Sequence, residues 1–156
     1  MFPGRLSKDS GGLLMDRDVV MNKLETLRRC LQRVQEKTPR SVDLLIENYD
    51  LQDIIVLNLE RAIQTSVDIG LHIISDLEVP VPETMAQTFE SLKNAGCLDS
   101  ATTERMAKSV GFRNTAVHAY QKIDWDIVYC IITEHLDDFR NFARQILQII
   151  EDQQDG

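Results

Sequence analysis

A single apolar stripe runs along the first part of the chain. Steps of four and three separate its members, which is the spacing of residues on one face of an α-helix. The stretch "KTPR" then ends the pattern, because the residue before a proline is disfavoured in the helical region of backbone space. We therefore predict a helix that starts at Asp16 and ends at this stretch, with its stripe formed by Val20, Leu24, Leu27, Leu31 and Val34.

The longest apolar pattern lies in the middle of the chain, over residues 51–76. One stripe of this segment holds Val56, Leu59, Ile63, Val67, Gly70 and Ile74. Apolar side chains also fall outside the stripe, among them Ile54, Leu57 and Leu71. More than one face of the helix should therefore be buried. We predict that it is the central helix or that it also faces a second subunit, and that a separate short helical turn covers residues 41–49.

Two further helices are predicted from their breakers and caps. "EVPVPE" interrupts the chain, and Pro82 suits the first turn of a helix over residues 82–95. In "NAGCLDS", Gly96 is a helix stop, and Asp99 or Ser100 can cap a helix that begins near residue 100.

The last helix should follow "QKID". Asp124 has the chemistry of an N-cap, with Ile123 and Val128 as a hydrophobic staple. One apolar face then continues to the end of the helix through Val128, Ile131, His135, Phe139, Phe142, Ile146 and Ile149. The chain has no strand-like alternation and no hairpin signal. We predict an all-α fold, an antiparallel up-and-down bundle of about five helices.

The length of 156 residues indicates one domain with a continuous core. Residues 1–14 are rich in glycine and proline, and we interpret them as a disordered extension or a remnant of cloning. The folded domain is expected over residues 15–151, with a flexible tail at 152–156. No apolar run is long enough to span a bilayer, and the N-terminus lacks the apolar core of a signal peptide, so a cytoplasmic location is expected.

Charge and cysteine content narrow the function classes. Residues 1–40 carry nine basic and five acidic residues, and residues 41–156 carry eight basic and twenty acidic, so the net charge is −8. This balance argues against broad coating of nucleic acid, although the basic first segment could attract an anionic partner or be a solvated helix face. Cys30, Cys97 and Cys130 are isolated, and we predict reduced, buried thiols rather than a disulfide frame or a zinc site.

Polar functional groups concentrate in "GFRNTAVHAYQKIDWD", residues 111–126. On a regular helix Asn114 and His118 share a face, and so do Arg113 and Tyr120. Arg113 and His118, however, lie five positions and about 140° apart, so one regular helix cannot aim both at one small atom. Three interpretations remain: an irregular helix near Gly111, convergence of the long side chains, or two copies facing each other across a dimer.

The cluster has a chemical and a structural interpretation. An imidazole can take the proton of a ribose 2′-hydroxyl, and a guanidinium can stabilise the charge that develops on phosphorus, with Asn114 orienting His118 and Tyr120 holding the strand or the network. Alternatively, the residues form a structural hydrogen-bond network. Asp53 and Glu60 could form salt bridges with Arg113 or be solvated. His72 and His135 are expected in the core, with Trp125 as a packing anchor.

The segment "RNTAVHAYQ" resembles the signature of HEPN-domain proteins of the HepT toxin type. This signature has an arginine, an adjacent polar residue, a histidine four to six positions after the arginine, and a tyrosine two positions past the histidine. "LQDIIVLNLERAIQTSVDIGLHI", "VGFRNTAVHAY" and the spacing through "DWDIVYCIITEHLDDF" support the resemblance, which covers about residues 16–150.

The resemblance implies a homodimeric helical bundle and a metal-independent ribonuclease toxin. Arg113 and His118 would be the catalytic pair, with Asn114 as the supporting polar residue. An MntA-like nucleotidyltransferase antitoxin would transfer AMP to Tyr120 and so block the cleft. No metal or other cofactor and no membrane partner are implied.

The substrate would be a structured RNA, such as tRNA or mRNA, because the acidic surface disfavours generic strands. The alternative is a non-catalytic helical module that docks a nucleotidyltransferase.

Overall fold

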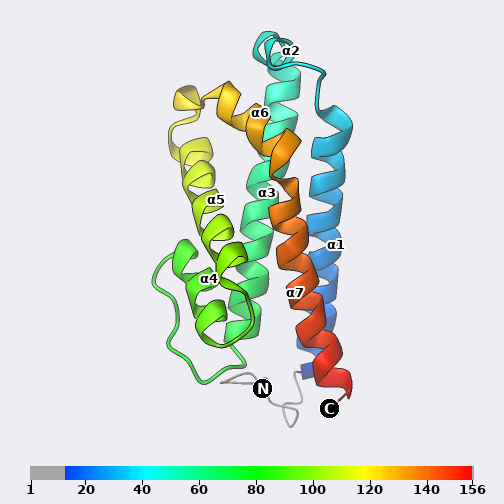
Figure 1. Cartoon of the computed structure of the whole chain (residues 1–156), viewed down its shortest axis with the longest axis vertical. Coiled ribbons are helices and arrows are strands. Elements are labelled where there is room, and N and C mark those ends of the chain that lie inside the picture. Colours follow the sequence, from blue (N-terminus) through cyan, green and yellow to red (C-terminus); the bar gives the residue numbers. More distant parts are fainter. Residues whose placement is uncertain (1–12, 156) are drawn as a thin grey trace.

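The computed structural model describes residues 13–155, and these residues form an all-α bundle, as predicted (Figure 1). The long helices lie along the long axis of the molecule. The elements are α1 (Leu13–Lys37), α2 (Val42–Glu47), α3 (Tyr49–Ile74), α4 (Met85–Asn94), α5 (Ser100–His118), a 3₁₀ turn η1 (Tyr120–Lys122), α6 (Trp125–Glu134) and α7 (Leu136–Asp155). The short α2 lies within the predicted helical turn at residues 41–49, and the last predicted helix is divided into α6 and α7.

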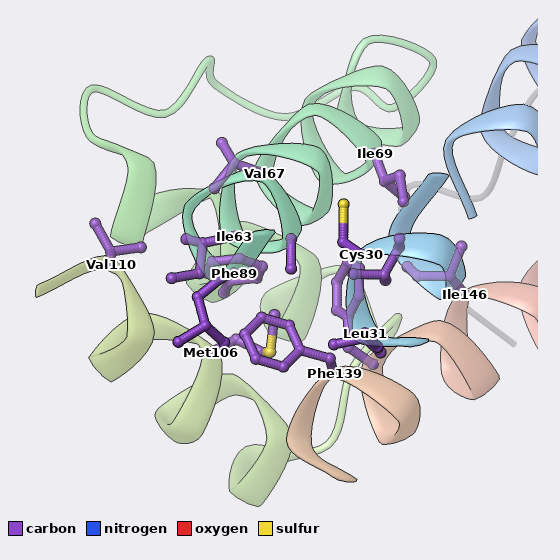
Figure 2. Packing of buried hydrophobic residues seen from close by; sticks show 14 of the residues in the cluster. Cys30, Leu31, Ile63, Val67, Ile69, Phe89, Met106, Val110, Phe139 and Ile146 are labelled. Carbon is purple, nitrogen blue, oxygen red and sulfur yellow. The ribbon is translucent and has the colours of Figure 1, made fainter. Parts of the chain in front are cut away.

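Helix α3 is the central element, as its two-sided apolar pattern predicted. It contacts α1, α4, α5 and α7, and its buried side chains include residues on both sides of the predicted stripe, such as Ile55 and Ile69. The predicted stripe of α1 is buried at Val20, Leu27 and Leu31. Figure 2 shows apolar side chains from α1, α3, α4, α5 and α7 meeting in one core. Burial of these side chains supplies most of the folding free energy.

Helix α4 starts later than predicted, and a glycine allows it to pack closely on α3. Thr84, rather than the prolines before it, caps the helix by accepting a hydrogen bond from the backbone N–H of Gln87 at 3.2 Å. A Cβ on Gly70 of α3 would lie 2.7 Å from a methyl group of Thr88 on α4. Gly70 therefore marks a close helix–helix approach that any larger residue would disturb.

The start of α5 follows the predicted chemistry. Gly96 has a left-handed φ of 80°, which suits a glycine after a helix end. Asp99 caps α5 by accepting a hydrogen bond from the backbone N–H of Thr102 at 2.7 Å. Gln145 of α7 ties this cap to the rest of the bundle, because its side chain bonds both the N–H and the carboxylate of Asp99. The N-terminal end of α5 is thus fixed by tertiary contacts.

The prediction of one continuous last helix is wrong, because the structure has two helices, α6 and α7, in its place. Helix α6 ends at Glu134, and His135 has φ −121° and ψ 8°, outside the helical region, before α7 begins at Leu136. Thr133 donates a side-chain hydrogen bond to the carbonyl of Tyr129, a contact that often bends helices. Asp124 does cap α6, as predicted, by accepting bonds from the N–H groups of Asp126 and Ile127.

Two predictions concern the ends of the chain, residues 1–14 and 152–156. The extension predicted for residues 1–14 lies mostly outside the described residues. At the other end, α7 remains helical to Asp155, and the flexible tail expected at 152–156 stays a prediction. Among residues 13–155, no helix is long and apolar enough to cross a membrane. The predicted homodimer stays a prediction at this stage.

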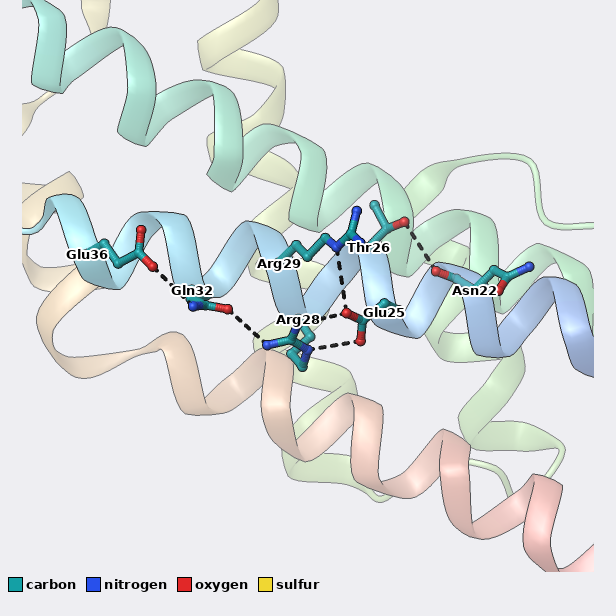
Figure 3. A network of polar contacts seen from close by, with 7 residues as sticks. All are labelled: Asn22, Glu25, Thr26, Arg28, Arg29, Gln32 and Glu36. Atoms are coloured by element: carbon teal, nitrogen blue, oxygen red, sulfur yellow. Dashed lines mark hydrogen bonds and ion pairs between the residues drawn. The ribbon is translucent and has the colours of Figure 1, made fainter.

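The basic surface of α1 is partly neutralised within the helix itself. Figure 3 shows Glu25 binding both Arg28 and Arg29, with nitrogen–oxygen distances of 2.7 and 3.6 Å. Arg33 lies 3.7 Å from Glu36 in the same way. Exposed pairs of this kind contribute little to stability, but they reduce the local positive potential. Of the two interpretations of this segment, a solvated helix face fits better than an anion-binding patch.

Candidate functional site

The predicted cluster lies at the C-terminal end of α5, where the helix stops. Ala119 has φ −149° and ψ 50°, outside the helical region, so the helix ends at His118. The chain then makes the 3₁₀ turn η1, which begins with Tyr120. Arg113 and Tyr120 therefore do not share a face of one helix, as the regular geometry had predicted. Because the helix ends before it, Tyr120 instead contacts Asp53 of α3.

Arg113 is only partly satisfied by its surroundings. Its Nη1 donates to Oδ1 of Asn114 at a long 3.4 Å. Its Nε is buried and has no hydrogen-bond partner in the structure. A buried donor without an acceptor is costly, more so when the group is charged. The guanidinium of Arg113 thus retains hydrogen-bonding capacity that no described residue uses.

His118 is exposed in the last turn of α5. It forms no hydrogen bond and no ion pair with another side chain among residues 17–153. Asn114 shares its face of the helix, yet the Asn114 side chain contacts Arg113 rather than His118. The predicted orienting role of Asn114 toward the imidazole is therefore not seen in the protomer. The imidazole is open to solvent and to any molecule that approaches this end of the bundle.

Tyr120 makes the strongest polar contact of the cluster. Its hydroxyl donates a hydrogen bond of 2.7 Å to Oδ1 of Asp53, near the start of α3. The edge of its ring packs against Trp125, with ring centroids 6.1 Å apart. Burial, and then the hydrogen bond and charge of Asp53, raise the pKa of the Tyr120 phenol above its ordinary value. The phenol is therefore held protonated and in a defined direction.

The salt bridge to Arg113 was one of two alternatives for the secondary carboxylates Asp53 and Glu60, the other being solvation. Asp53 binds Tyr120, and neither Asp53 nor Glu60 forms an ion pair with Arg113 in the described part of the chain. The Asp53–Tyr120 bond joins residues 67 positions apart in sequence. Sequence reasoning named both residues but did not pair them, because no local pattern reports a contact between α3 and η1.

A groove beside the cluster was missed by sequence reasoning. It encloses about 730 Å³ between α5, α6 and α7, and its lining includes Phe112, Thr115, Ile127 and Ile131. Gly111 also lines it, and a Cβ on this glycine would meet no atom within 4 Å. In the sequence, Ile127 is the residue that could have indicated this groove. It is a large apolar residue near the start of the short helix α6, and the structure leaves it exposed.

The remaining histidines and cysteines lie away from the cluster. His72 is only partly buried near the end of α3, and His135 is partly exposed, 3.6 Å from Asp138, so neither is the core residue we predicted. Cys30 and Cys97 are buried as expected.

The prediction that all three thiols are buried is wrong for Cys130. It is exposed and donates to Glu134 at 3.1 Å. Ligand atoms of Cys130, Glu134 and His135 lie within 4.8 Å of one another at the α6–α7 junction. Trp125 is partly buried against the core, as a packing anchor should be.

Comparison with known proteins places these features in a family. The family model described as "Ribonuclease HepT-like" matches residues 24–146. The chain is 32% identical over 125 residues to the mRNA nuclease HepT of Shewanella oneidensis, covering 80% of this chain and 93% of that protein. It is 28% identical over 128 residues to the tRNA nuclease HepT of Aphanizomenon flos-aquae, covering 82% and 87%.

Solved structures agree with the sequence comparisons. One is a crystal structure of a toxin–antitoxin with AMP-PNP, with a TM-score of 0.79, 30% identity and coverage of 84% of this chain and 98% of that chain. Another is the tri-AMPylated HEPN toxin of Shewanella oneidensis in complex with MNT antitoxin, with a TM-score of 0.79, 31% identity and the same coverage. From its matched residues, its relatives and its fold, the chain belongs to the HepT-like ribonuclease family.

Proposed function

We propose that the chain is the toxin of a toxin–antitoxin pair and cleaves RNA with Arg113 and His118. The observation that carries this proposal is the state of the two side chains: an exposed imidazole without a protein partner, five residues after a guanidinium whose buried Nε is unused. Residues that only stabilise a fold are usually satisfied by hydrogen bonds. Here the imidazole is open to a ligand, and the guanidinium keeps a donor that no described residue uses.

The chemistry needs no metal ion. The imidazole of His118 takes the proton of a ribose 2′-hydroxyl as that oxygen attacks the adjacent phosphorus. Arg113 stabilises the negative charge that develops on the phosphoryl oxygens, for which its planar fork of donors is suited. The bond from phosphorus to the 5′-oxygen of the next nucleotide breaks, the 5′-oxygen leaves with the electron pair and takes a proton from water, and the strand is cut with a 2′,3′-cyclic phosphate on its upstream part.

A second copy of the chain would complete the cleft. Arg113 and His118 project about 140° apart on α5, which is a regular helix up to His118. Two α5 ends facing each other would place two guanidinium and two imidazole groups around one phosphodiester. They would also concentrate positive charge on a protein whose net charge is −8. The homodimer is therefore part of the proposed mechanism.

The partner would be an MntA-like nucleotidyltransferase that transfers AMP to Tyr120. Support comes from the relatives, since one solved structure is a tri-AMPylated HEPN toxin with its MNT antitoxin. Tyr120 is 38% exposed, so a nucleotide can reach its hydroxyl. Each AMP would bring a negative phosphate and a bulky adenosine next to the cluster, and would exclude RNA by repulsion and by occupancy.

A structured RNA is the substrate that we propose. Two of the relatives are named as an mRNA nuclease and a tRNA nuclease. The acidic balance of residues 41–156 disfavours binding through the phosphate backbone alone, so recognition of shape in tRNA or in a folded mRNA segment fits the charge better.

Replacement of His118 by alanine tests the nuclease function. We expect RNA cleavage to fall by about 10²–10⁴, the usual contribution of a general base, and growth arrest to be lost. The matched control is His135→Ala, which removes another partly exposed imidazole and should leave cleavage unchanged. Undiminished cleavage by His118→Ala would contradict the mechanism. Intact RNA after incubation with the unaltered protein, together with normal binding of the nucleotidyltransferase, would instead favour a docking module.

The acceptor role of Tyr120 has a separate test. Intact-mass measurement after incubation with ATP and an MntA-like nucleotidyltransferase should show added AMP units on the unaltered chain. Tyr120→Phe removes only the hydroxyl and should show none. The control is Tyr49→Phe, because Tyr49 is 77% exposed at the start of α3 and offers a competing phenol. Loss of AMP from the Tyr49 variant would contradict Tyr120 as the acceptor.

A further inference from the structure

The Asp53–Tyr120 hydrogen bond is the feature of the site that packing does not explain. Asp53 is exposed and Tyr120 is 38% exposed, so burial does not force either group to find a protein partner. An exposed phenol bonded to water loses little. Yet the two side chains meet at 2.7 Å across two elements that are 67 residues apart in sequence. Burial therefore does not account for this short hydrogen bond between Tyr120 and the exposed carboxylate of Asp53.

The geometry of this bond resembles that between a nucleophile and its base. The hydroxyl of Tyr120 donates, and the carboxylate of Asp53 accepts, at a distance within the range for direct proton transfer. The Trp125 ring, 6.1 Å away, contacts the ring of Tyr120 and limits its rotation. The part of the phenol that remains exposed leaves a path for an incoming phosphate. Nucleophile, base and approach are thus arranged before any partner binds.

We propose that Asp53 accepts the phenolic proton when AMP is transferred to Tyr120. This inference rests on the proposed role of Tyr120 as the AMP acceptor. ATP, supplied by the nucleotidyltransferase, is the co-reactant. The phenolic oxygen of Tyr120 forms a bond to the α-phosphorus of ATP, and the bond from that phosphorus to the β-phosphate oxygen breaks. Pyrophosphate leaves with the electron pair, and the proton passes to Oδ1 of Asp53.

A base is required because the phenol does not ionise readily here. Its pKa lies above the ordinary value, through burial first and through Asp53 second, so a free phenolate is scarce near neutral pH. The proton must therefore leave as the new bond forms. Its transfer also neutralises Asp53, so a carboxylate charge disappears beside the site where a phosphodiester charge arrives. Repulsion is therefore reduced while the new bond forms, and the proton then passes from Asp53 to solvent.

Other basic groups near Tyr120 are already used or lie elsewhere. Asp124 caps α6 through two backbone N–H groups. His118, two residues before Tyr120, forms no hydrogen bond with the phenol in the described structure. Among residues 17–153, Asp53 is the acceptor that the Tyr120 hydroxyl binds. The catalytic group for the transfer would thus be supplied by the modified protein itself and not only by the enzyme that modifies it.

The test compares Asp53→Asn with the unaltered chain. Asparagine has nearly the same shape and keeps an oxygen that can accept the tyrosine hydrogen bond, but it cannot take a proton. We expect the rate of the first AMP addition, measured by intact mass under single-turnover conditions, to fall by about 10²–10⁴. Asp50→Asn is the matched control: it makes the same charge change one turn earlier on α3, at an exposed residue, and should keep the unaltered rate.

A rescue experiment separates proton transfer from mere positioning. Asp53→Ala leaves space for a small carboxylate, and added formate should restore part of its AMP transfer without changing its binding to the nucleotidyltransferase in size-exclusion chromatography. An unaltered or faster rate in Asp53→Asn would overturn the role of Asp53, and so would a loss in Asp53→Ala that formate does not restore. The acceptor itself is judged independently by the Tyr120→Phe variant, since AMP addition to that variant at the unaltered rate would refute Tyr120.

Discussion

The two ends of helix α5 carry polar clusters of opposite character. At the N-terminal end, Gln145 donates to Oδ2 of Asp99 at 3.1 Å and to the hydroxyl of Thr102 at 2.8 Å, and its Oε1 accepts from the N–H of Asp99 at 2.8 Å. Asp99 also accepts from the N–H of Thr102. The side-chain amide and carboxylate groups all have partners, so this cluster holds α5 against α7.

At the C-terminal end of α5, the polar side chains are not all paired with one another by hydrogen bonds. Arg113 has a buried Nε without a partner, and His118 is exposed. Only Tyr120 is firmly bound, and its partner is a potential base. The same helix thus has a cluster that stabilises the fold at one end and a cluster that keeps its donors available at the other. A satisfied network indicates structure, while an unsatisfied one indicates a group kept for a ligand.

Among the variants that test the contrast between the two ends of α5, Arg113→Lys should have the largest effect, because it keeps the charge but removes the planar fork. We expect RNA cleavage to fall by about 10²–10³, in the range found for removal of one transition-state donor. The free energy of unfolding should be unchanged or slightly higher, because the unpartnered Nε is replaced by a methylene. Cleavage assays and denaturant titrations on one preparation measure both quantities.

The contrast between the two ends of α5 would be contradicted if Arg113→Lys reduced both the free energy of unfolding and RNA cleavage. Such a result would mean that the guanidinium supports the fold, as the structural interpretation of the cluster holds. A suitable control is Arg105→Lys on the same helix, because Arg105 is an exposed residue paired with Asp138 at 3.7 Å. That variant should retain both cleavage and stability.

At the other end of α5, Asp99→Ala should reduce stability and leave the chemistry intact. Loss of an N-cap costs about 0.5–2 kcal/mol, and in a protein of this size each kcal/mol lowers Tm by about 2–4 °C. Thermal unfolding measures the loss, and RNA cleavage well below the Tm should match the unaltered chain. A fall in cleavage at full folding would show that the two ends of α5 are not independent.

A smaller effect is expected at Gly111, which precedes the C-terminal cluster. The glycine lies within a helix, is exposed, and would place a Cβ in open space. Gly111→Ala should therefore stabilise the protomer by about 0.5–1 kcal/mol, through the lower conformational entropy of the unfolded chain. Denaturant unfolding at low protein concentration measures this gain. Destabilisation would indicate that another chain approaches this position closely.

Local patterns were enough to predict most of the fold. The stripe of α1, the two-sided pattern of α3 and the caps at Asp99 and Asp124 each report on their own few neighbours, and the structure confirms them. The start of α4 was misplaced because Thr84 competes with Pro82 as the start signal. The α6–α7 break was missed because neither glycine nor proline marks it. An uninterrupted apolar face across His135 hid the change of direction.

Contacts between distant elements could not be predicted from those patterns. Arg113, Asn114, His118 and Tyr120 were identified as a cluster, yet their helix was assumed to continue through the tyrosine. The end of α5 at His118 turns Tyr120 toward Asp53, and that contact depends on how α3 and α5 pack. Spacing along a helix describes one element only, whereas the polar partners of a site are set by the tertiary arrangement.

The smallest predicted effect concerns the pH dependence of the structural cluster. Hydrogen bonds from Thr102, and then from Gln145, hold the pKa of Asp99 below its ordinary value. A group with a lowered pKa in the folded state contributes stability above its unfolded pKa, about 3.9 for aspartate, and loses that contribution as the pH falls through the folded value. Asp99→Asn keeps an N-cap of similar quality but removes the charge.

We therefore expect the unaltered chain to exceed Asp99→Asn in the free energy of unfolding at neutral pH by less than about 1 kcal/mol, given the exposure of the carboxylate. The gap should narrow steadily as the pH falls below about 4. Urea titrations of both proteins at several pH values measure it. A gap that stays constant down to the lowest pH would mean that the charge of Asp99 adds nothing to the cap, and that the network at this end of α5 is stabilised by neutral hydrogen bonds alone.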